Sequence, residues 1–209
     1  MSLVSIAGAC SRAGKTALAE TVLRARGAGI SVAVKFTTTE DVFERCPRGT
    51  TCIVCDIDVP FRIVEDPALL AEAGTDTARL GQAGARRVIW TIAKAAHALA
   101  AWRATCERMQ GAAHVVVEGS TVVELAHPDT LFFVVHPFLS TARWKETSGP
   151  LIARADAVVV NRPAGEAREP APEVLLALRQ ARGRDDAIVA DVTRPLHEWA
   201  PQFAARIAA

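Results

Sequence analysis

The sequence predicts an α/β fold, in which a mainly parallel β-sheet carries helices on both faces. Short runs rich in β-branched residues alternate along the chain with longer segments rich in Ala, Leu and Arg. The short runs are apolar throughout, as expected of strands that are covered on both faces. With 209 residues, half of them hydrophobic, the chain is long enough to bury a sizeable core. We therefore expect one domain over residues 1–209.

The expected elements follow one another regularly. A buried strand over 3–7 precedes a helix over 15–29, which ends in glycines as helices often do. A second strand is expected over 30–35 and a second helix over 75–85. Further strands are expected over 86–93, 114–119, 131–136, 156–161 and 186–191, and further helices over 94–110, 171–183 and 195–208. Ligands in such sheets bind beyond the carboxyl ends of the strands, so the residues that follow each strand are the first candidates for a site.

The segment from about 36 to 70 differs from the rest of the chain. It is polar, it is interrupted by prolines, and it contains Cys46, Cys52 and Cys55. We expect it to be an inserted loop rather than part of the regular alternation.

Residues 8–16, with the sequence GACSRAGKT, connect the first expected strand to the first expected helix. Small residues in such a turn allow successive backbone N–H groups to point toward phosphate oxygens, and the helix N-terminus adds partial positive charge. A lysine and a threonine at the helix start suit the terminal phosphates and Mg²⁺, respectively. The spacing differs from the usual Gly-x-x-x-x-Gly-Lys-Thr pattern, because Ala9 stands where the first glycine would be.

Either this loop is one residue longer than usual, starting at Gly8, or Ala9 takes the place of the glycine. In both cases we predict a phosphate-binding loop. The nucleotide-binding residues expected in it are Gly8, Ala9, Cys10, Ser11, Arg12, Ala13, Gly14, Lys15, Thr16 and Ala17.

Lysine is rare in this chain. Only four of the 24 basic residues are lysines, and two of them, Lys15 and Lys35, fall within the first 35 residues. Lys35 ends the second expected strand, so its ammonium group should lie at the same sheet edge as Lys15. We predict that it contacts phosphate or substrate, the alternative being a solvated strand end.

Glu118 and Gly119 follow the buried strand that begins at His114. At that position a carboxylate can hold Mg²⁺ through water or orient a nucleophile, and a glycine lets the backbone pass close to a γ-phosphate. We therefore predict Lys15, Lys35 and Glu118 as catalytic residues, and Thr16 and Glu118 as Mg²⁺ ligands.

Asn161 and Arg162 end a later strand and are expected to contact the base of the nucleotide. Guanine-binding proteins with a phosphate loop usually carry Asn-Lys-x-Asp here, whereas residues 161–164 read Asn-Arg-Pro-Ala. The carboxylate that accepts two guanine N–H groups is absent from this pattern. That favours ATP over GTP, and both stay open. Residues 190–195 are expected to form the other side of the base pocket.

The cysteines of the 36–70 segment have the spacing C-x5-C-x2-C. Two thiolates in a short turn can bind one ion, so Cys46, Cys52 and Cys55 predict a zinc site, or an iron–sulfur cluster shared across a dimer. Unliganded cysteines and redox switching of Cys52 and Cys55 are the alternatives.

The composition excludes some classes of protein. With 24 basic and 23 acidic residues, the chain lacks the charge excess typical of nucleic-acid-binding and membrane-surface proteins. No apolar run approaches the length of a membrane span, and no basic region precedes the first apolar run. We expect a cytoplasmic protein whose cysteines are thiols or metal ligands rather than disulfides.

Taken together, these residues resemble the SIMIBI class of P-loop NTPases, and within it the MobB-type family of adapters for molybdenum-cofactor guanylylation. The resemblance is carried by the 8–16 loop, the strand that ends at Lys35, and VVVEG at 115–119. In addition, DTARLGQAGA at 76–85 is similar to the family's Asp-Ser-x-Arg-x-x-x-Ala-Gly-Ala segment. The family's histidines after the strand-ending lysine are replaced here by Phe36 and threonines. Dethiobiotin synthetase, of the same class, is similar in its Lys-ended second strand, its Glu-Gly strand and its late Asn-Arg.

This resemblance implies the three-layer sandwich of the P-loop NTPases and a homodimer. It leaves three functions open. The first is Mg²⁺-dependent binding and hydrolysis of a nucleoside triphosphate in cofactor or metallocentre biosynthesis, together with a partner enzyme. The second is an ATP-dependent small-molecule kinase or ligase of the dethiobiotin-synthetase type, with the acceptor held by residues 36–66. The third is a metal-sensing regulator in which the nucleotide is structural.

Overall fold

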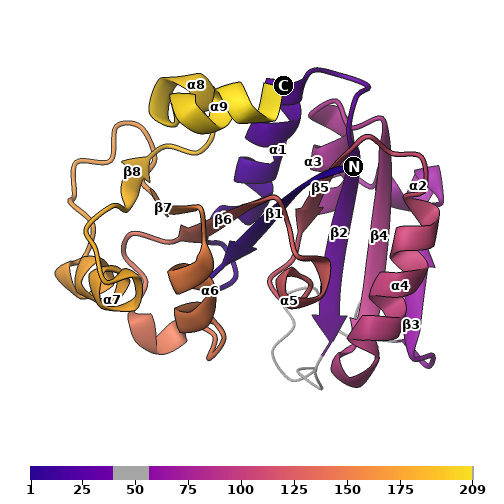
Figure 1. The fold of residues 1–209 in the computed structure, drawn as a ribbon, viewed down its shortest axis with the longest axis horizontal. Coiled ribbons are helices and arrows are strands. Elements are labelled where there is room, and N and C mark those ends of the chain that lie inside the picture. The colour runs from indigo at the N-terminus through magenta and orange to yellow at the C-terminus, as the bar shows by residue number, and fades with distance from the viewer. Residues whose placement is uncertain (40–56, 209) are drawn as a thin grey trace.

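The structure is a computed structural model that describes residues 1–39 and 57–208 (Figure 1). Within these residues, eight strands form one sheet in the order β3-β4-β2-β5-β1-β6-β7-β8. All neighbouring strands are parallel except β3, which pairs with β4 in the antiparallel sense. The strands are β1 (Ser2–Gly8), β2 (Val32–Thr39), β3 (Phe61–Val64), β4 (Arg87–Lys94), β5 (His114–Glu118), β6 (Thr130–Val135), β7 (Ala157–Asn161) and β8 (Ile188–Ala190). The predicted α/β fold with a mainly parallel sheet is confirmed.

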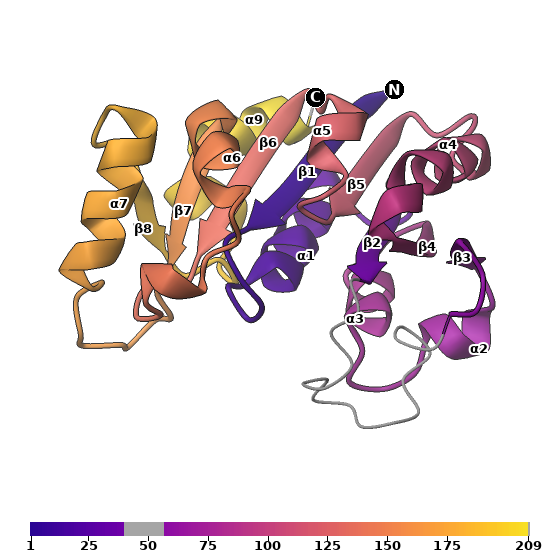
Figure 2. The ribbon, with the colours of Figure 1, turned by 90° about the horizontal axis from the view of Figure 1, so that it is seen from below.

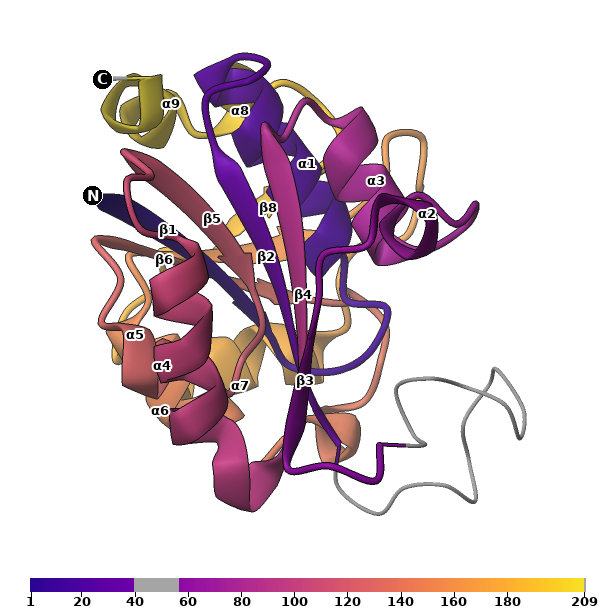
Figure 3. The ribbon, with the colours of Figure 1, turned by 90° about the vertical axis from the view of Figure 1, so that its right-hand side faces the viewer.

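Helices cover both faces of this sheet. The helices α1, α3, α8 and α9 lie on one face, and α4, α5, α6 and α7 lie on the other (Figures 2 and 3). Their bounds are α1 (Lys15–Arg26), α2 (Pro67–Leu70), α3 (Asp76–Gln82), α4 (Ala98–Arg108), α5 (Val123–Ala126), α6 (Ser148–Arg154), α7 (Pro172–Arg182), α8 (Leu196–Trp199) and α9 (Pro201–Ala208). In the part of the chain that the structure describes, no helix combines the length and the apolar character needed to span a membrane.

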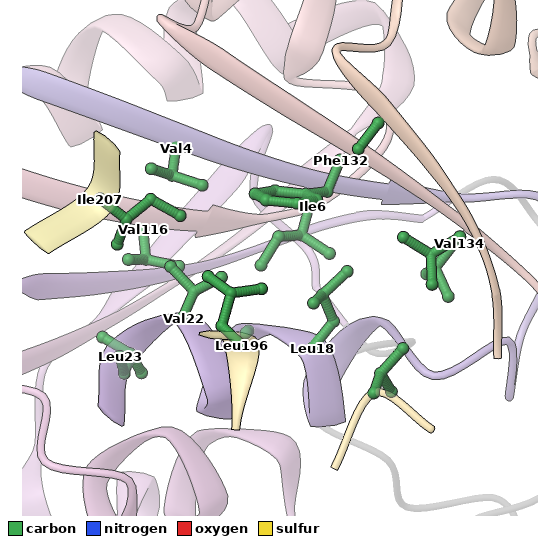
Figure 4. Packing of buried hydrophobic residues seen from close by; sticks show 14 of the residues in the cluster. Val4, Ile6, Leu18, Val22, Leu23, Val116, Phe132, Val134, Leu196 and Ile207 are labelled. Carbon is green, nitrogen blue, oxygen red and sulfur yellow. The ribbon is translucent and has the colours of Figure 1, made fainter. Parts of the chain in front are cut away.

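The core on the first face is built around α1. Leu18 and Val22 of this helix pack against Ile6 and Phe132 of the sheet, and Leu196 of α8 closes the cluster (Figure 4). These side chains are all nearly or completely buried. Apolar positions four residues apart lie on one side of a helix, which is why α1 presents a continuous apolar surface to the strands. This packing holds the start of α1 rigidly against the end of β1.

On the second face, two further clusters fill the space under the helices. Val34 and Val117 of the sheet pack against Trp102 of α4, while Phe133 packs against Leu151 of α6 and the buried side of α7. Neighbouring residues of one strand therefore point to opposite faces of the sheet. Phe132 packs in the core on the first face, and Phe133 packs in a core cluster on the second face. The strands read as apolar throughout because both of their faces are covered.

Some expected boundaries were wrong. The strand expected over 30–35 begins at Val32 and continues to Thr39, because β4 pairs with it over its whole length. The helix expected over 94–110 begins as a 3₁₀ turn over Ala95–His97 before α4 starts.

The prediction of an inserted loop over 36–70 was wrong for the residues described at its two ends. The end of β2, the edge strand β3 and the short helix α2 all lie within that segment. Phe61 and Ile63 of β3 pack on the second-face core, and Val64 packs with Leu70 of α2 and Trp90 of β4. These tertiary contacts stabilise a strand and a helix in a stretch that looks polar and irregular in the sequence.

Candidate functional site

The sheet brings two of the predicted catalytic residues together at its carboxyl edge. Strand β5 lies between β1 and β2, so Glu118 at the end of β5 is next to the 8–16 loop, as expected. In the parallel pairing of β2 with β5, Lys35 is directly opposite Glu118. Side chains opposite each other on neighbouring strands emerge on the same face about 5 Å apart, which places this ammonium group against this carboxylate.

The 8–16 loop connects β1 to α1 and requires glycine at both ends. A Cβ atom on Gly8 would lie 2.9 Å from Lys15 Cγ and from the carbonyl oxygen of Val134. Gly14 has φ +109°, and a Cβ atom there would lie 2.3 Å from Asn161 Nδ2. Both positions therefore exclude larger residues, one by crowding and the other also by its backbone conformation.

The backbone of the same loop leaves a run of donors free. Within residues 1–39 and 57–208, the N–H groups of residues 10–17 donate to no acceptor. Helix α1 begins at Lys15, and its N-cap residue Gly14 has no side chain with which to cap it. The first N–H groups of a helix have no partner within the helix, so this run of free donors at the N-terminus of α1 forms a ready anion-binding site.

Ala9 differs from the residues that follow it. Its N–H donates to the carbonyl oxygen of Val134, and its own carbonyl oxygen accepts from the N–H of Lys145. Its methyl group is fully buried. Ala9 thus occupies the first position of the loop after Gly8 and anchors it, and its N–H is already used within the protein.

An ionic network lies next to the loop. Lys35 Nζ is 2.6 Å from Glu118 Oε1 and 2.6 Å from Asp76 Oδ2, so one ammonium group bridges two carboxylates. Thr16 Oγ1 donates to Glu118 Oε2 at 3.0 Å. The Glu118 side chain is only 1% exposed and the Lys35 side chain 16% exposed, which makes this a largely buried network. It connects the start of α1 with β2, β5 and the first turn of α3.

The pKa values of these groups follow from their surroundings. Although burial alone would lower the pKa of Lys35, the carboxylates of Glu118 and Asp76 outweigh it and raise that pKa. Burial likewise opposes the charge of Asp76, but Lys35 lowers the pKa of that carboxyl group below its usual value. Burial lowers the pKa of Lys15, and the positive charges of Lys35 and Lys145 add to this effect. Lys15 Nζ donates to the carbonyl oxygen of Cys10 at 2.9 Å.

A cavity of about 810 Å³ opens over the loop and the network. Its walls come from the 8–16 loop and the start of α1, the end of β2, the first turn of α3 and the residues that follow β5. Five basic side chains and two carboxylates line it: Arg12, Lys15, Lys35, Arg79 and Lys145, with Asp76 and Glu118. The excess of positive charge suits an anionic ligand.

Gly119 and Ser120 bring the chain that follows β5 close to this cavity. A Cβ atom on Gly119 would lie 2.6 Å from the carbonyl oxygen of Phe36, so only glycine fits there. The hydroxyl group of Ser120 accepts from the N–H of Gly8 and donates to its carbonyl oxygen, both at 3.2 Å. The segment after β5 is thereby bonded to the start of the 8–16 loop.

Sequence reasoning did not assign Asp76, Ser120 or Lys145 to the site. The N-cap of α3 is Thr75, and the carboxylate of Asp76, the first residue of the helix, pairs with Lys35. For Lys145 a signal existed in the composition, because three of the four lysines of the chain line this one cavity. For Ser120 the only signal was its position directly after Gly119.

Asn161 and Arg162 lie behind the loop rather than in the wall of the cavity. Asn161 Nδ2 donates to the carbonyl oxygen of Ala13, and Asn161 Oδ1 accepts from the N–H of Val192. The guanidinium group of Arg162 donates to the carbonyl oxygen of Glu166 and forms an ion pair with the carboxylate of Glu169. Asn161 thus connects the 8–16 loop to the residues after β8, and contact of either side chain with a base stays a prediction.

The predicted cysteine site falls on Cys46, Cys52 and Cys55, which lie outside the described residues. Across residues 1–39 and 57–208, no group of three or more His, Cys, Asp or Glu side chains is arranged to hold a metal ion. Of the described cysteines, Cys10 is buried in the 8–16 loop and Cys106 is partly exposed on α4.

The oxygen atoms at the site fit Mg²⁺ better than they fit a transition metal. The Thr16 hydroxyl group and the Glu118 carboxylate are in contact, and the Asp76 carboxylate is joined to the same network through Lys35. Mg²⁺ is usually held by one or two carboxylates, with water and substrate phosphates as its other ligands. Binding of Mg²⁺ by Thr16 and Glu118 stays a prediction.

A scan against protein-family models and a search of curated proteins gave no match to this chain.

Proposed function

We propose that the protein binds a nucleoside triphosphate with Mg²⁺ at the 8–16 loop and hydrolyses it, as a P-loop NTPase. The observation that carries this proposal is the run of eight N–H groups over residues 10–17 that find no acceptor in the described part of the chain, at the N-terminus of a twelve-residue helix. The N–H groups would surround the phosphates, and the Lys15 ammonium group, released from the Cys10 carbonyl oxygen, would reach the terminal ones. Binding of the phosphates by the N–H groups and movement of the Lys15 side chain would both leave the fold unchanged.

The ionic network supplies the remaining groups that phosphoryl transfer requires. Thr16 and Glu118 would hold Mg²⁺, which neutralises charge on the phosphates when it is bound. Lys35 keeps its positive charge because Glu118 and Asp76 raise its pKa, so it can stabilise negative charge that develops on the transferring group. Catalysis of this kind depends mainly on positioning and electrostatics, and a buried, hydrogen-bonded network provides both.

We place this activity in cofactor or metallocentre biosynthesis, on the resemblance of 8–16, 76–85 and 115–119 to the MobB-type adapters. Asp76 and Arg79, two residues of the 76–85 segment, line the cavity, which supports a role for that segment at the nucleotide site. On the same resemblance, a homodimer and a partner enzyme are expected.

A second candidate is an ATP-dependent small-molecule kinase or ligase. The cavity extends beyond the 8–16 loop to Thr37, Thr38, Thr121 and Arg79, which offers hydroxyl groups and a cation to an acceptor. Slow hydrolysis of Mg-ATP or Mg-GTP without any added acceptor would favour the NTPase, whereas strict dependence of turnover on an acceptor would favour the kinase.

Replacing Lys15 with alanine tests the proposal. We expect Lys15→Ala to abolish measurable binding of Mg-ATP and Mg-GTP in isothermal titration calorimetry while the circular dichroism spectrum is unchanged. Lys94→Ala is a matched control, because it removes the same charge from an exposed lysine at the end of β4 that does not line the cavity. Undiminished nucleotide affinity in Lys15→Ala, or no affinity in the wild type, would refute the assignment.

A further inference from the structure

Lys145 lies on the far side of the 8–16 loop from Lys35, in the chain between β6 and α6. It lines the same cavity as Gly14, Lys15 and Thr16, although 130 positions separate it from Lys15 along the sequence. Its side chain is exposed.

The backbone around Lys145 is held on both sides. Its N–H donates to the carbonyl oxygen of Ala9 at 2.9 Å, which bonds it to the first position of the 8–16 loop. Its carbonyl oxygen accepts from the N–H of Ser148, where α6 begins, and the preceding Trp144 packs on the second-face core. A long side chain on a fixed backbone reaches a defined region, and here that region is the cavity.

Among the described residues, the charge of Lys145 also has no carboxylate partner. Lys35 has two carboxylate partners, whereas Lys145 and Lys15 form no ion pair among residues 1–39 and 57–208. The charge of Lys145 lowers the pKa of Lys15, so the two ammonium groups repel each other. Such repulsion favours an anion that binds both groups.

We propose that Lys145 binds the polyphosphate part of the nucleotide directly, as a third phosphate-binding lysine supplied by the chain between β6 and α6. This inference rests on the proposed function, and it names a contact that the loop pattern in the sequence does not contain. The polyphosphate would then lie between Lys15 at the start of α1 and Lys145 at the opposite side of the loop.

Arg143 offers a matched control for the electrostatic part of this argument. Like Lys145, Arg143 lowers the pKa of Cys10 through its charge, although burial raises that pKa overall. Both cations are therefore near the loop, but only Lys145 lines the cavity. Removal of Arg143 changes only the positive electrostatic potential at the loop. Removal of Lys145 changes this potential and also removes the proposed contact with the phosphates.

The test measures binding of Mg-ATP and of inorganic tripolyphosphate by isothermal titration calorimetry. We expect Lys145→Ala to weaken both by about tenfold or more, since a hydrogen bond between charged groups is lost. We expect Lys145→Arg to keep most of the affinity, and Arg143→Ala to change it by less than about threefold. If Lys145→Ala proves unstable in thermal unfolding, Lys145→Gln, which keeps most of the side-chain stem, replaces it.

The possible results separate this inference from the proposed function. Equal losses in Lys145→Ala and Arg143→Ala would overturn the direct contact, as would a loss for Mg-ATP with none for tripolyphosphate. In either case the nucleotide site would stand, provided that Lys15→Ala abolishes binding. Failure of the wild type to bind either ligand would refute the proposed function itself.

Discussion

Replacing Lys35 with methionine should destabilise the protein strongly, even without any ligand. Methionine has a similar length but no charge, so the variant leaves the carboxylates of Glu118 and Asp76 without the ammonium group that joins them at 2.6 Å on each side. The two carboxylates differ in burial, and this difference sets the magnitude.

The Glu118 side chain is 1% exposed, so water solvates its charge poorly in the folded state. Removal of one partner of a buried ion pair costs about 3–5 kcal/mol. The lower end applies here, because Thr16 still donates to Glu118 Oε2. Asp76 is 41% exposed and adds little, about 0–1 kcal/mol, since water screens it. We expect a loss of about 3 kcal/mol, a large part of the ~5–15 kcal/mol that stabilises a typical protein.

The assay is urea unfolding at neutral pH for the wild type, Lys35→Met, Glu118→Gln and the double variant. Glu118→Gln alone should cost less than Lys35→Met, because Lys35 keeps Asp76 as a partner. The double variant should be more stable than Lys35→Met, because no uncompensated charge is then buried at position 118. A double variant less stable than Lys35→Met, or a loss below about 1 kcal/mol in Lys35→Met, would show that the network does not stabilise the fold as argued.

Two other predictions concern the loop and the opposite edge of the sheet. Gly14→Ala should lower the free energy of unfolding by about 1–3 kcal/mol and weaken nucleotide binding, because the new Cβ lies at φ +109° and 2.3 Å from Asn161 Nδ2; urea unfolding and calorimetry measure the two effects. Acidification should lower the thermal unfolding temperature as the pH falls through about 6.5, where His114 of the unfolded chain takes up a proton. In the folded protein, burial and the neighbouring Arg26 lower the pKa of His114, so the unfolded state binds more protons in this range. His114→Asn should reduce that dependence.

Each of these predictions has its own control. Gly14→Ala should cost less stability in an Asn161→Ala background than in the wild type, because the steric contact is then absent while the backbone strain stays. If Gly14→Ala is as stable as the wild type, the loop geometry described above is incorrect. If the thermal unfolding temperatures of His114→Asn and of the wild type fall equally as the pH is lowered, the pH dependence of stability comes from other groups.

Much of the candidate site could be predicted from short stretches of sequence. The unpaired N–H groups of residues 10–17 follow from small residues and a helix start, both of which are local. Lys35 and Glu118 could be placed at the carboxyl edge because each ends an apolar run, and strands of a parallel sheet end at the same edge. Asp76 and Lys145 could not be placed in this way, since neither ends a strand.

The errors in the fold have a related cause. Strand β3 is only four residues long, and its pattern is weak. Its conformation is stabilised by antiparallel pairing with β4 and by packing under α4, neither of which is visible in its own residues. Helices α5 and α6 were missed for a similar reason, because they are short and depend on their contacts with the sheet.

The sequence by itself determined the alternation of buried strands with amphipathic helices, and the small-residue loop that precedes Lys15. These features depend on side chains a few positions apart, whose spacing follows from helix and strand geometry. Only the tertiary structure decided the order of the strands, the register that sets Lys35 against Glu118, and the approach of Asp76 and Lys145 to one cavity. Neighbouring parallel strands are joined by long crossovers, so their pairing depends on the packing of segments far apart in the chain and is not encoded in either segment alone.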